Sequence, residues 1–125
     1  MVLGFGRKKI LIVEDNPDQL TILKSVLEKQ GFKIITATDG EEAVDRSKDE
    51  TPDLILMDIN MPGLRGDMAA LRIRGDATTK DIPIIMLTAV DDVQEKVLAS
   101  QTGAVDYITK PYKPEELLAK IKAHI

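Results

Sequence analysis

The chain has 125 residues, of which 43% are hydrophobic and 30% are charged, and its formal net charge is −4. This length favours a single globular domain, and the composition is not that of a disordered or fibrous chain. Because the chain has no cysteine, disulfides, thiolate metal sites and cysteine nucleophiles are excluded. The negative charge and the aromatic content of 3% argue against a direct nucleic-acid partner.

The termini and the apolar runs carry no targeting or membrane signal. No apolar run approaches the roughly 20 residues of a membrane span, and the basic cluster at 7–9 follows a glycine-containing stretch, which is the wrong order for a secretory signal. We therefore expect a cytoplasmic protein without membrane contacts. Residues 1–8 are predicted to be an N-terminal tail and residues 9–125 one domain.

Short apolar runs predict five strands, and most of the runs are continuous, as in strands that are buried on both faces. They lie at residues 10–13, 34–37, 54–57, 84–87 and 105–108.

Helix signals follow the first two strands. Asn16 and Pro17 are typical of a helix cap and a first helical residue, Gln19 completes a capping-box spacing with Asn16, and Gly31 ends the helix. Asp39 and Glu42 repeat the capping pattern before a second helix. Thr51-Pro52 should end that helix, since a residue before proline disfavours helical geometry.

Apolar residues mark three later helices. Met68 and Leu71 predict a short third helix that ends near Gly75. The fourth and fifth are predicted from Val93, Val97 and Leu98, closed by Gly103, and from Leu117, Leu118, Ile121 and Ile125 after Pro114. Five strands that alternate with five helices predict an α/β fold, in which a doubly wound parallel sheet is covered on both faces.

Polar residues stand where four of the five predicted strands end. Glu14 and Asp15 follow the first strand, Asp58 the third, Thr88 the fourth, and Lys110 comes just after the fifth. Because ligands of doubly wound sheets bind at the carboxyl ends of the strands, these side chains are expected to share one site.

Three carboxylates in one site would repel one another by about 3 kcal/mol per pair at about 5 Å. Either one of them is protonated or a cation is bound. Oxygen ligands without histidine or sulfur favour a hard divalent ion, and magnesium above others. Magnesium in turn indicates phosphate chemistry, in which Lys110 and Thr88 can contact phosphoryl oxygens.

Together, Glu14-Asp15, the segment DINMPG at 58–63, Gly66, Thr88-Ala89 and Lys110-Pro111 resemble the receiver domain of bacterial two-component response regulators. The resemblance extends over residues 9–125. It implies a flavodoxin-like sheet of strand order 2-1-3-4-5 and a phosphorylation-activated switch. Such a switch is a phosphoacceptor that assists its own phosphorylation and dephosphorylation, and is not otherwise an enzyme.

The resemblance also implies a role for each acidic residue. Asp58 is the expected phosphoacceptor, which takes its phosphoryl group from a phosphohistidine on a histidine kinase or a histidine phosphotransfer protein. Asp15 and Asp58 would bind Mg²⁺ directly, the backbone carbonyl of Asn60 would supply a third ligand, and Glu14 would act through water.

The remaining implied roles concern the switch itself. Lys110 would contact the phosphoryl group, Thr88 would move to bond it, and Tyr107 matches an aromatic switch position that follows Thr88. The peptide bond before Pro111 is expected to be cis. The surface formed by the fourth helix, fifth strand and fifth helix is the expected binding face for a downstream protein.

Several alternatives stay open. The chain could be a receiver excised from a larger regulator or hybrid histidine kinase, or an interaction module that works without phosphorylation. A nucleotide- or flavin-binding domain would need a glycine- or hydroxyl-rich phosphate cradle after the first strand, where Glu14-Asp15 stands. Among single residues, Tyr107 could be simple packing, Asn60 and Val90 match positions that tune phosphoryl lifetime, and His124 is expected to be exposed and without a role.

Overall fold

The computed structural model describes residues 7–89 and 92–125, so most of the predicted tail and Val90 lie outside the described residues. Strands and helices alternate along the chain as predicted. They are β1 (Lys9–Val13), α1 (Pro17–Lys29), β2 (Lys33–Ala37), α2 (Gly40–Glu50), β3 (Leu54–Asp58), α3 (Gly66–Arg74), β4 (Ile84–Ala89), α4 (Val93–Gln101), β5 (Asp106–Lys110) and α5 (Pro114–His124).

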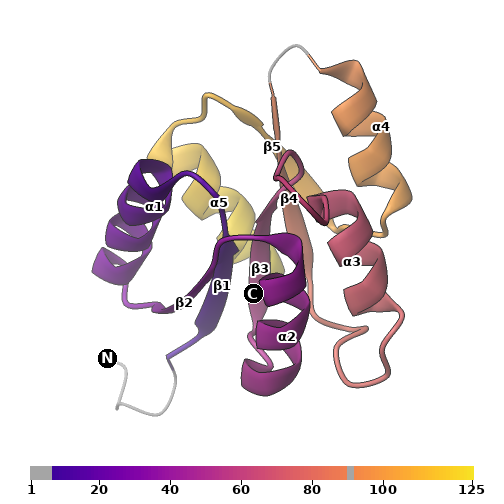
Figure 1. Ribbon diagram of the computed structural model, residues 1–125. Coiled ribbons are helices and arrows are strands. Elements are labelled where there is room, and N and C mark those ends of the chain that lie inside the picture. Colours follow the sequence, from indigo (N-terminus) through magenta and orange to yellow (C-terminus); the bar gives the residue numbers. More distant parts are fainter. Residues whose placement is uncertain (1–6, 90–91) are drawn as a thin grey trace.

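The five strands form one sheet in the order β2-β1-β3-β4-β5, and every neighbouring pair is parallel. Helices α1 and α5 cover one face of this sheet, and α2, α3 and α4 cover the other (Figure 1). The predicted doubly wound, flavodoxin-like order is therefore confirmed. None of the described helices has the length and apolar character that a membrane crossing requires.

Alternate residues of each central strand point into two separate cores. Leu11 and Met57 belong to the core beneath α2, α3 and α4, whereas Ile12 and Leu56 belong to the core beneath α1 and α5. Burying a side chain of this size contributes about 1.5–3 kcal/mol. Because both faces are covered, the central strands must be apolar at every position, which explains their continuous hydrophobic runs.

The predicted apolar faces of α3 and α4 are wrong. Four of the five bulky residues that marked them are between 47% and 74% exposed, and these are Met68, Leu71, Val93 and Val97. The fifth, Leu98, is half-buried. The side chains that face the core are mostly small, namely Ala69, Ala70 and Ala99, with Ile73 as the larger exception. Small side chains allow a helix to pack closely on the sheet, and a pattern based on bulky residues does not detect them.

Two other contacts shape the ends of strands. At Gly66, a Cβ would lie 2.0 Å from the backbone oxygen of Asp58, so only glycine lets the loop after β3 fold back against that strand end. On β5, the Asp106 carboxylate lies 3.0 Å from Lys120 Nζ and 3.3 Å from His124 Nε2. His124 is thus part of the contact between β5 and α5, which corrects the expectation that it is exposed and without a role.

Candidate functional site

Acidic side chains from two neighbouring strands meet at the carboxyl edge of the sheet. Asp58 is the last residue of β3, and Glu14 and Asp15 come directly after β1. One carboxylate oxygen from each of the three lies within 4.8 Å of the others. The parallel pairing of β1 with β3 aligns their ends, so residues more than 40 positions apart in the chain enter one cluster.

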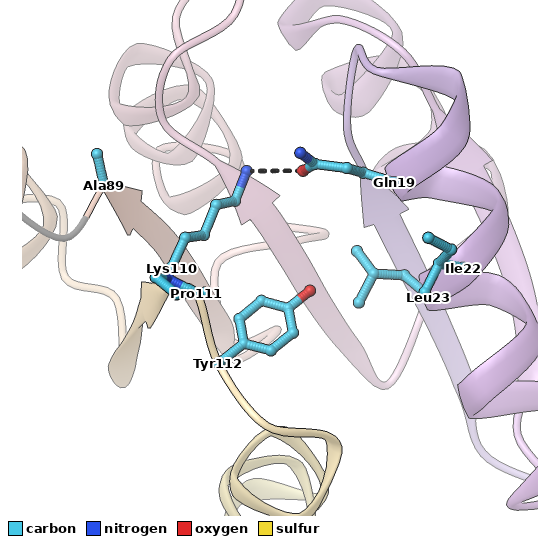
Figure 2. Close-up of a pocket in the computed structure, with 7 residues that line it drawn as sticks. All are labelled: Gln19, Ile22, Leu23, Ala89, Lys110, Pro111 and Tyr112. Carbon is cyan, nitrogen blue, oxygen red and sulfur yellow. Dashed lines mark hydrogen bonds between the residues drawn. The ribbon is translucent and has the colours of Figure 1, made fainter.

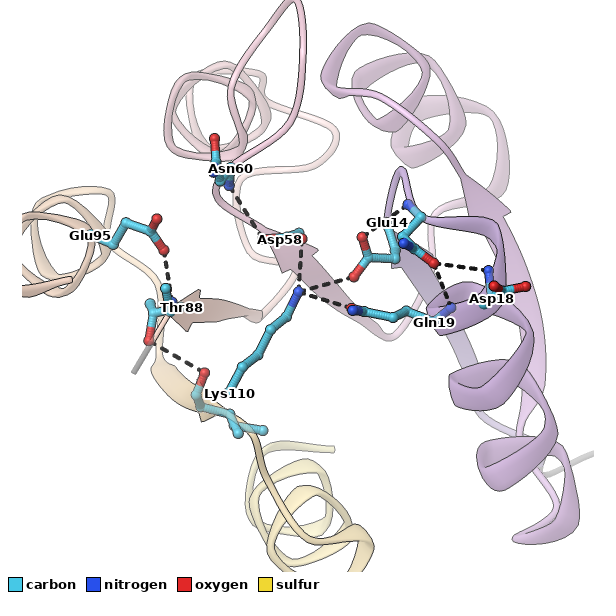
Figure 3. Close-up of polar contacts among 11 residues, drawn as sticks. Glu14, Asp18, Gln19, Asp58, Asn60, Thr88, Glu95 and Lys110 are labelled. Carbon is cyan, nitrogen blue, oxygen red and sulfur yellow. Dashed lines mark hydrogen bonds and ion pairs between the residues drawn. The ribbon is translucent and has the colours of Figure 1, made fainter. Parts of the chain in front are cut away.

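The Lys110 ammonium group contacts two acids of this cluster, Glu14 and Asp58 (Figure 3). Its Nζ atom is 2.9 Å from Asp58 Oδ2, 3.1 Å from Glu14 Oε1 and 3.2 Å from Gln19 Oε1. A lysine ammonium has three N–H donors, and each of them has an acceptor here. A lysine from β5 therefore reduces the repulsion between carboxylates that the sequence predicts. The sequence had suggested only protonation of a carboxylate or a bound metal ion as ways to reduce it.

Burial sets the electrostatics of the site. The Glu14 residue is only 1% exposed, and burial together with the Asp58 carboxylate raises its pKa, despite the opposing effect of Asn16 N–H and Lys110. Burial works against the charged form of Lys110 as well. Its contacts with Asp58 and Glu14 outweigh that effect and raise the pKa of Lys110 above its ordinary value. Lys110 is therefore a permanent cation at this site.

The other oxygen of Asp58 is also engaged. Asp58 Oδ1 accepts a hydrogen bond of 3.2 Å from the backbone N–H of Asn60, at the start of the loop that follows β3. On the opposite side, the peptide bond between Lys110 and Pro111 is cis, as the resemblance implies. The Asp58 carboxylate is thus oriented by one backbone group and one ammonium group.

Thr88 is turned away from the acids. Its side chain is buried, and its hydroxyl lies 3.4 Å from the backbone carbonyl of Ile108 on β5, to which it donates a long hydrogen bond. Tyr107, the neighbour of Ile108, is 42% exposed on the outside of β5. Thr88 is thus hydrogen-bonded to the strand that contains Tyr107, and it has no hydrogen bond to Asp58.

A pocket of about 590 Å³ opens next to the lysine, between α1 and the start of the segment that leads to α5 (Figure 2). Its walls are mainly apolar, and burial raises the pKa of the Tyr112 phenol in one of them. The lining residues are Gln19, Ile22, Leu23, Ala89, Lys110, Pro111 and Tyr112.

Known proteins are similar to this chain in sequence and in fold. The model of the response regulator receiver domain family matches residues 10–122. The chain belongs to this family. It is 43% identical to the protein PilH of Pseudomonas aeruginosa, over 92% of the chain and 95% of PilH. It is 44% identical to PhoP of Bacillus subtilis, a transcriptional regulatory protein of alkaline phosphatase synthesis, over 93% of the chain but only 48% of PhoP. The chain thus spans about half the length of that relative.

Among solved structures, one similar chain is the receiver domain of a sensor histidine kinase from Pseudomonas aeruginosa. It has a TM-score of 0.88 and 33% identity, and the match covers 95% of this chain and 98% of that one. That crystal structure has a magnesium ion coordinated in the active site cleft. Receiver domains form a family of phosphoacceptor switches, which take phosphoryl groups from histidine kinases and act on downstream targets.

The receiver's acidic cluster has the donor chemistry for such an ion. Its ligand atoms are all carboxylate oxygens, which hard cations such as Mg²⁺ prefer. Both Glu14 oxygens already accept hydrogen bonds, from Lys110 and from the backbone N–H of Asn16. Asp15 is exposed, and its side chain has no hydrogen bond to another described residue. Both Asp58 oxygens accept hydrogen bonds as well, so the exposed Asp15 carboxylate is the most accessible of the three to a cation.

Gln19 is a site residue that the sequence analysis missed. The structure corrects its assignment to a capping box, because the backbone N–H of Asn16 is bonded to Glu14 and the Gln19 carboxamide contacts Lys110. Asn16 still caps α1, since its side chain accepts from the backbone N–H groups of Asp18 and Gln19. The sequence offered one indication of this role, which is that Gln19 lies about one helical turn beyond Asp15 and therefore near the predicted site.

Glu95 is a second missed residue. It is only 5% exposed, and its Oε1 accepts a hydrogen bond of 2.9 Å from the backbone N–H of Ala89 at the end of β4. Its own N–H donates to Asp92 Oδ1 at 3.0 Å, which caps α4. The capping spacing of Asp92 and Glu95 was readable in the sequence, but the contact with Ala89 depends on how α4 packs. Glu95 therefore ties α4 to the residue that follows Thr88.

Replacing Lys110 with methionine should raise the pKa of Glu14 further, because the positive charge that lowers it would be lost. A carboxyl group whose pKa is raised by folding stabilises the protein while it is protonated, and this contribution disappears as the pH rises through the folded-state pKa. The free energy of unfolding of Lys110→Met should therefore fall with rising pH over a wider range above about pH 4 than that of the wild type.

Carboxyl-carbon NMR titration and urea unfolding in metal-free buffer measure both effects. Lys113→Met, at an exposed lysine near the site, is the matched control and should leave the titration of Glu14 unchanged. An unchanged or lowered pKa of Glu14 in Lys110→Met would contradict the proposed charge balance.

Proposed function

We propose that this receiver domain is a phosphorylation-activated signalling switch, in which Asp58 accepts a phosphoryl group from a phosphohistidine in the presence of Mg²⁺. The donor would be a histidine kinase or a histidine phosphotransfer protein. The observation that carries the proposal is the Lys110 ammonium, 2.9 Å from the carboxylate of Asp58 and within an acidic cluster. A nucleophilic carboxylate, a fixed cation and metal ligands in one place are the requirements of phosphoryl transfer.

In the proposed step, an Asp58 carboxylate oxygen attacks phosphorus while the phosphorus–nitrogen bond of the donor breaks. The electron pair of that bond stays with the imidazole nitrogen. Lys110 neutralises charge on a phosphoryl oxygen, and the Thr88 hydroxyl turns to donate to another. The same groups would assist the later attack of water on the acyl phosphate, so the receiver would act on its own modification and on no separate substrate.

A magnesium ion would screen the charge of the incoming phosphoryl group. We propose that Asp15 and Asp58 hold it directly, that the backbone carbonyl of Asn60 is a further ligand, and that Glu14 acts through water. The exposure of Asp15 and the burial of Glu14 support the different roles of these two carboxylates. The magnesium ion in the active site cleft of the related histidine kinase receiver supports the choice of metal.

The pocket beside Lys110 supports a protein as the phosphoryl donor. Lys110, which contacts Asp58, is one of its lining residues. Its walls are largely apolar, and Ile22, another lining residue, is 63% exposed. An imidazole carried on a partner's helix could approach Asp58 from this side, while the helix packs against α1. The exposed apolar rim would then be buried, which favours binding.

The output face in this proposal is formed by α4, β5 and α5. Thr88 now donates to the Ile108 carbonyl of β5, so a turn toward the phosphoryl group would break that bond next to Tyr107. Several large apolar side chains are exposed on α4, on β5 and at the residue just before β5, which suits a protein-binding surface. They are Val93, Val97, Val105 and Tyr107.

Relatives of this chain include a protein of similar length and a protein about twice as long. The match covers 95% of PilH but only 48% of PhoP, which is therefore about twice as long as the chain. A receiver that acts by itself and a receiver that is part of a larger regulator or hybrid kinase are both consistent with these relatives. The cytoplasmic location and the identity of the downstream partner also stay predictions.

Acetyl phosphate and Mg²⁺ should add the mass of one phosphoryl group to the wild-type chain, measured by intact mass spectrometry at neutral pH. Asp58→Asn should abolish the adduct, because an amide is too weak a nucleophile for this step. Asp45→Asn, at an exposed aspartate of α2, should keep it. If the wild type gains no adduct from acetyl phosphate or from a phosphohistidine donor, the chain is the phosphorylation-independent module instead.

Mg²⁺ should raise the melting temperature, since it binds the folded state alone. At 100 times the dissociation constant the stabilisation is about 2.7 kcal/mol, or on the order of 10 °C for a domain of this size. Asp15→Asn should remove most of this shift, and Asp18→Asn, at an exposed aspartate in the first turn of α1, should retain it. An equal shift in both variants would place the ion elsewhere.

Phosphorylation should change the amide NMR signals of α4 and β5 as well as those of the site. Thr88→Ala should still become phosphorylated, but it should lose the changes around Tyr107, since the hydroxyl that links the two regions is absent. Spectra recorded with and without acetyl phosphate, at saturating Mg²⁺, give this comparison. Changes confined to residues next to Asp58 in the wild type would argue against this output face.

A further inference from the structure

We propose that Gln19 is a positioning residue, which holds the Lys110 ammonium at the site where it meets the phosphoryl group. This inference rests on the proposed phosphoryl transfer to Asp58 and extends it to a residue on α1. The observation behind it is the contact of 3.2 Å between Gln19 Oε1 and Lys110 Nζ. Figure 3 shows the Gln19 side chain extended from α1 toward the lysine.

Three acceptors on three different segments determine the position of the ammonium group. They belong to α1 through Gln19, to the segment after β1 through Glu14 and to the end of β3 through Asp58. Lysine is a flexible side chain with four methylene groups, and a single ion pair leaves its end much freedom. Because each N–H has its own acceptor, Nζ is confined to one place, as efficient phosphoryl transfer requires.

Gln19 is the neutral member of this set, and its neutrality matters. Glu14 and Asp58 share the positive charge of Lys110, and Asp15 adds a further negative charge nearby. Another carboxylate at position 19 would compete for the ammonium and repel an incoming phosphoryl group. A carboxamide oxygen orients Lys110 without adding negative charge, so the ammonium keeps its attraction for phosphoryl oxygens.

The contact also has to survive the reaction. When Asp58 becomes an acyl phosphate, the oxygen that now faces Lys110 no longer carries a full carboxylate charge, and the ammonium shifts its contact to a phosphoryl oxygen. Gln19 is unaffected by that change. It can therefore keep the lysine in place before and after the phosphoryl transfer. The aliphatic part of Lys110 lines the same pocket as Leu23 and Tyr112 (Figure 2).

The local structure of α1 makes Gln19 available for this role. Asn16 caps the helix and Pro17 begins it, so Gln19 lies in the first turn, at the end of the helix that faces the site. In a capping box, the glutamine side chain would bond the backbone N–H of Asn16. Glu14 Oε2 accepts that N–H instead, at 3.1 Å, which leaves the carboxamide free to contact Lys110.

Exchange of the Lys110 ammonium protons with water tests the contact without any phosphorylation. In protein labelled with ¹⁵N-lysine, the wild-type Lys110 ammonium should give an observable, protected NMR signal. Gln19→Met keeps the length of the side chain but removes the acceptor, so exchange should become about three- to tenfold faster, as expected for loss of one of three hydrogen bonds. Gln30→Met, at the exposed C-terminal cap of α1, is the matched control and should leave the exchange rate unchanged.

Phosphorylation rates then show whether Gln19 positions Lys110 for the transfer or only contributes to the fold. With acetyl phosphate and Mg²⁺, Gln19→Met should slow the modification of Asp58 about three- to tenfold. Gln19→Glu restores an acceptor oxygen, so it should restore the proton protection of Lys110, but the rate should stay low because of the added charge. Gln19→Ala repeats the test with a residue of high helix propensity, and circular dichroism verifies the fold of each variant.

Wild-type exchange and phosphorylation rates in Gln19→Met would overturn the inference about Gln19. Full recovery of the rate in Gln19→Glu would overturn the argument from neutrality. If the wild type accepts no phosphoryl group, the proposed function fails, and with it the transfer role of Gln19. The exchange measurement would then report on the contact alone, so the two failures are distinguishable.

Discussion

The ion pair between Lys110 and Asp58 is the interaction on which the rest of the site depends. The two residues end strands that are not neighbours, since β4 lies between β3 and β5. Two strand spacings amount to about 10 Å, so only a long side chain can bring a cation from β5 to Asp58. Lysine has that length, and its path passes over the end of β4, where Thr88 and Ala89 lie. One interaction therefore links β5 to β3 across β4.

Burial strengthens the ion pair between Lys110 and Asp58, and it also makes this ion pair sensitive to any charge added to the site. Glu14 is almost completely buried, and this burial, with a smaller effect of the Asp58 carboxylate, raises the pKa of Glu14. The positive charge of Lys110 is shared by two carboxylates, those of Glu14 and Asp58. A phosphoryl group or a divalent cation would change the net charge of this group of side chains. A site with opposing charges in fixed positions responds to a new charge by a change in contacts, and this is the physical basis of a switch.

The fold supplies a route by which such a change could leave the site. Thr88 is bonded to β5, and the next residue, Ala89, is bonded to the buried carboxylate of Glu95 on α4. These two hydrogen bonds are made by consecutive residues at the end of β4. The outer surfaces of α4 and β5 also carry exposed apolar side chains, which the sequence had suggested as core in the case of Val93 and Val97. Their exposure is explained by the small residue Ala99, which packs on the sheet in their place.

The order of strands and helices could be predicted from local patterns, because continuous apolar runs, caps and glycines act over a few residues. It also determined which chemical groups stand at the strand ends, and the resemblance of Glu14-Asp15, Asp58 and Lys110 to a known family assigned their roles. Only the tertiary structure decided what those groups touch. Gln19 and Lys110 are 91 positions apart, and Glu95 meets the backbone of Ala89 rather than another side chain. Such contacts depend on how helices pack on the sheet, and packing depends on shape across the whole domain, which no local pattern records.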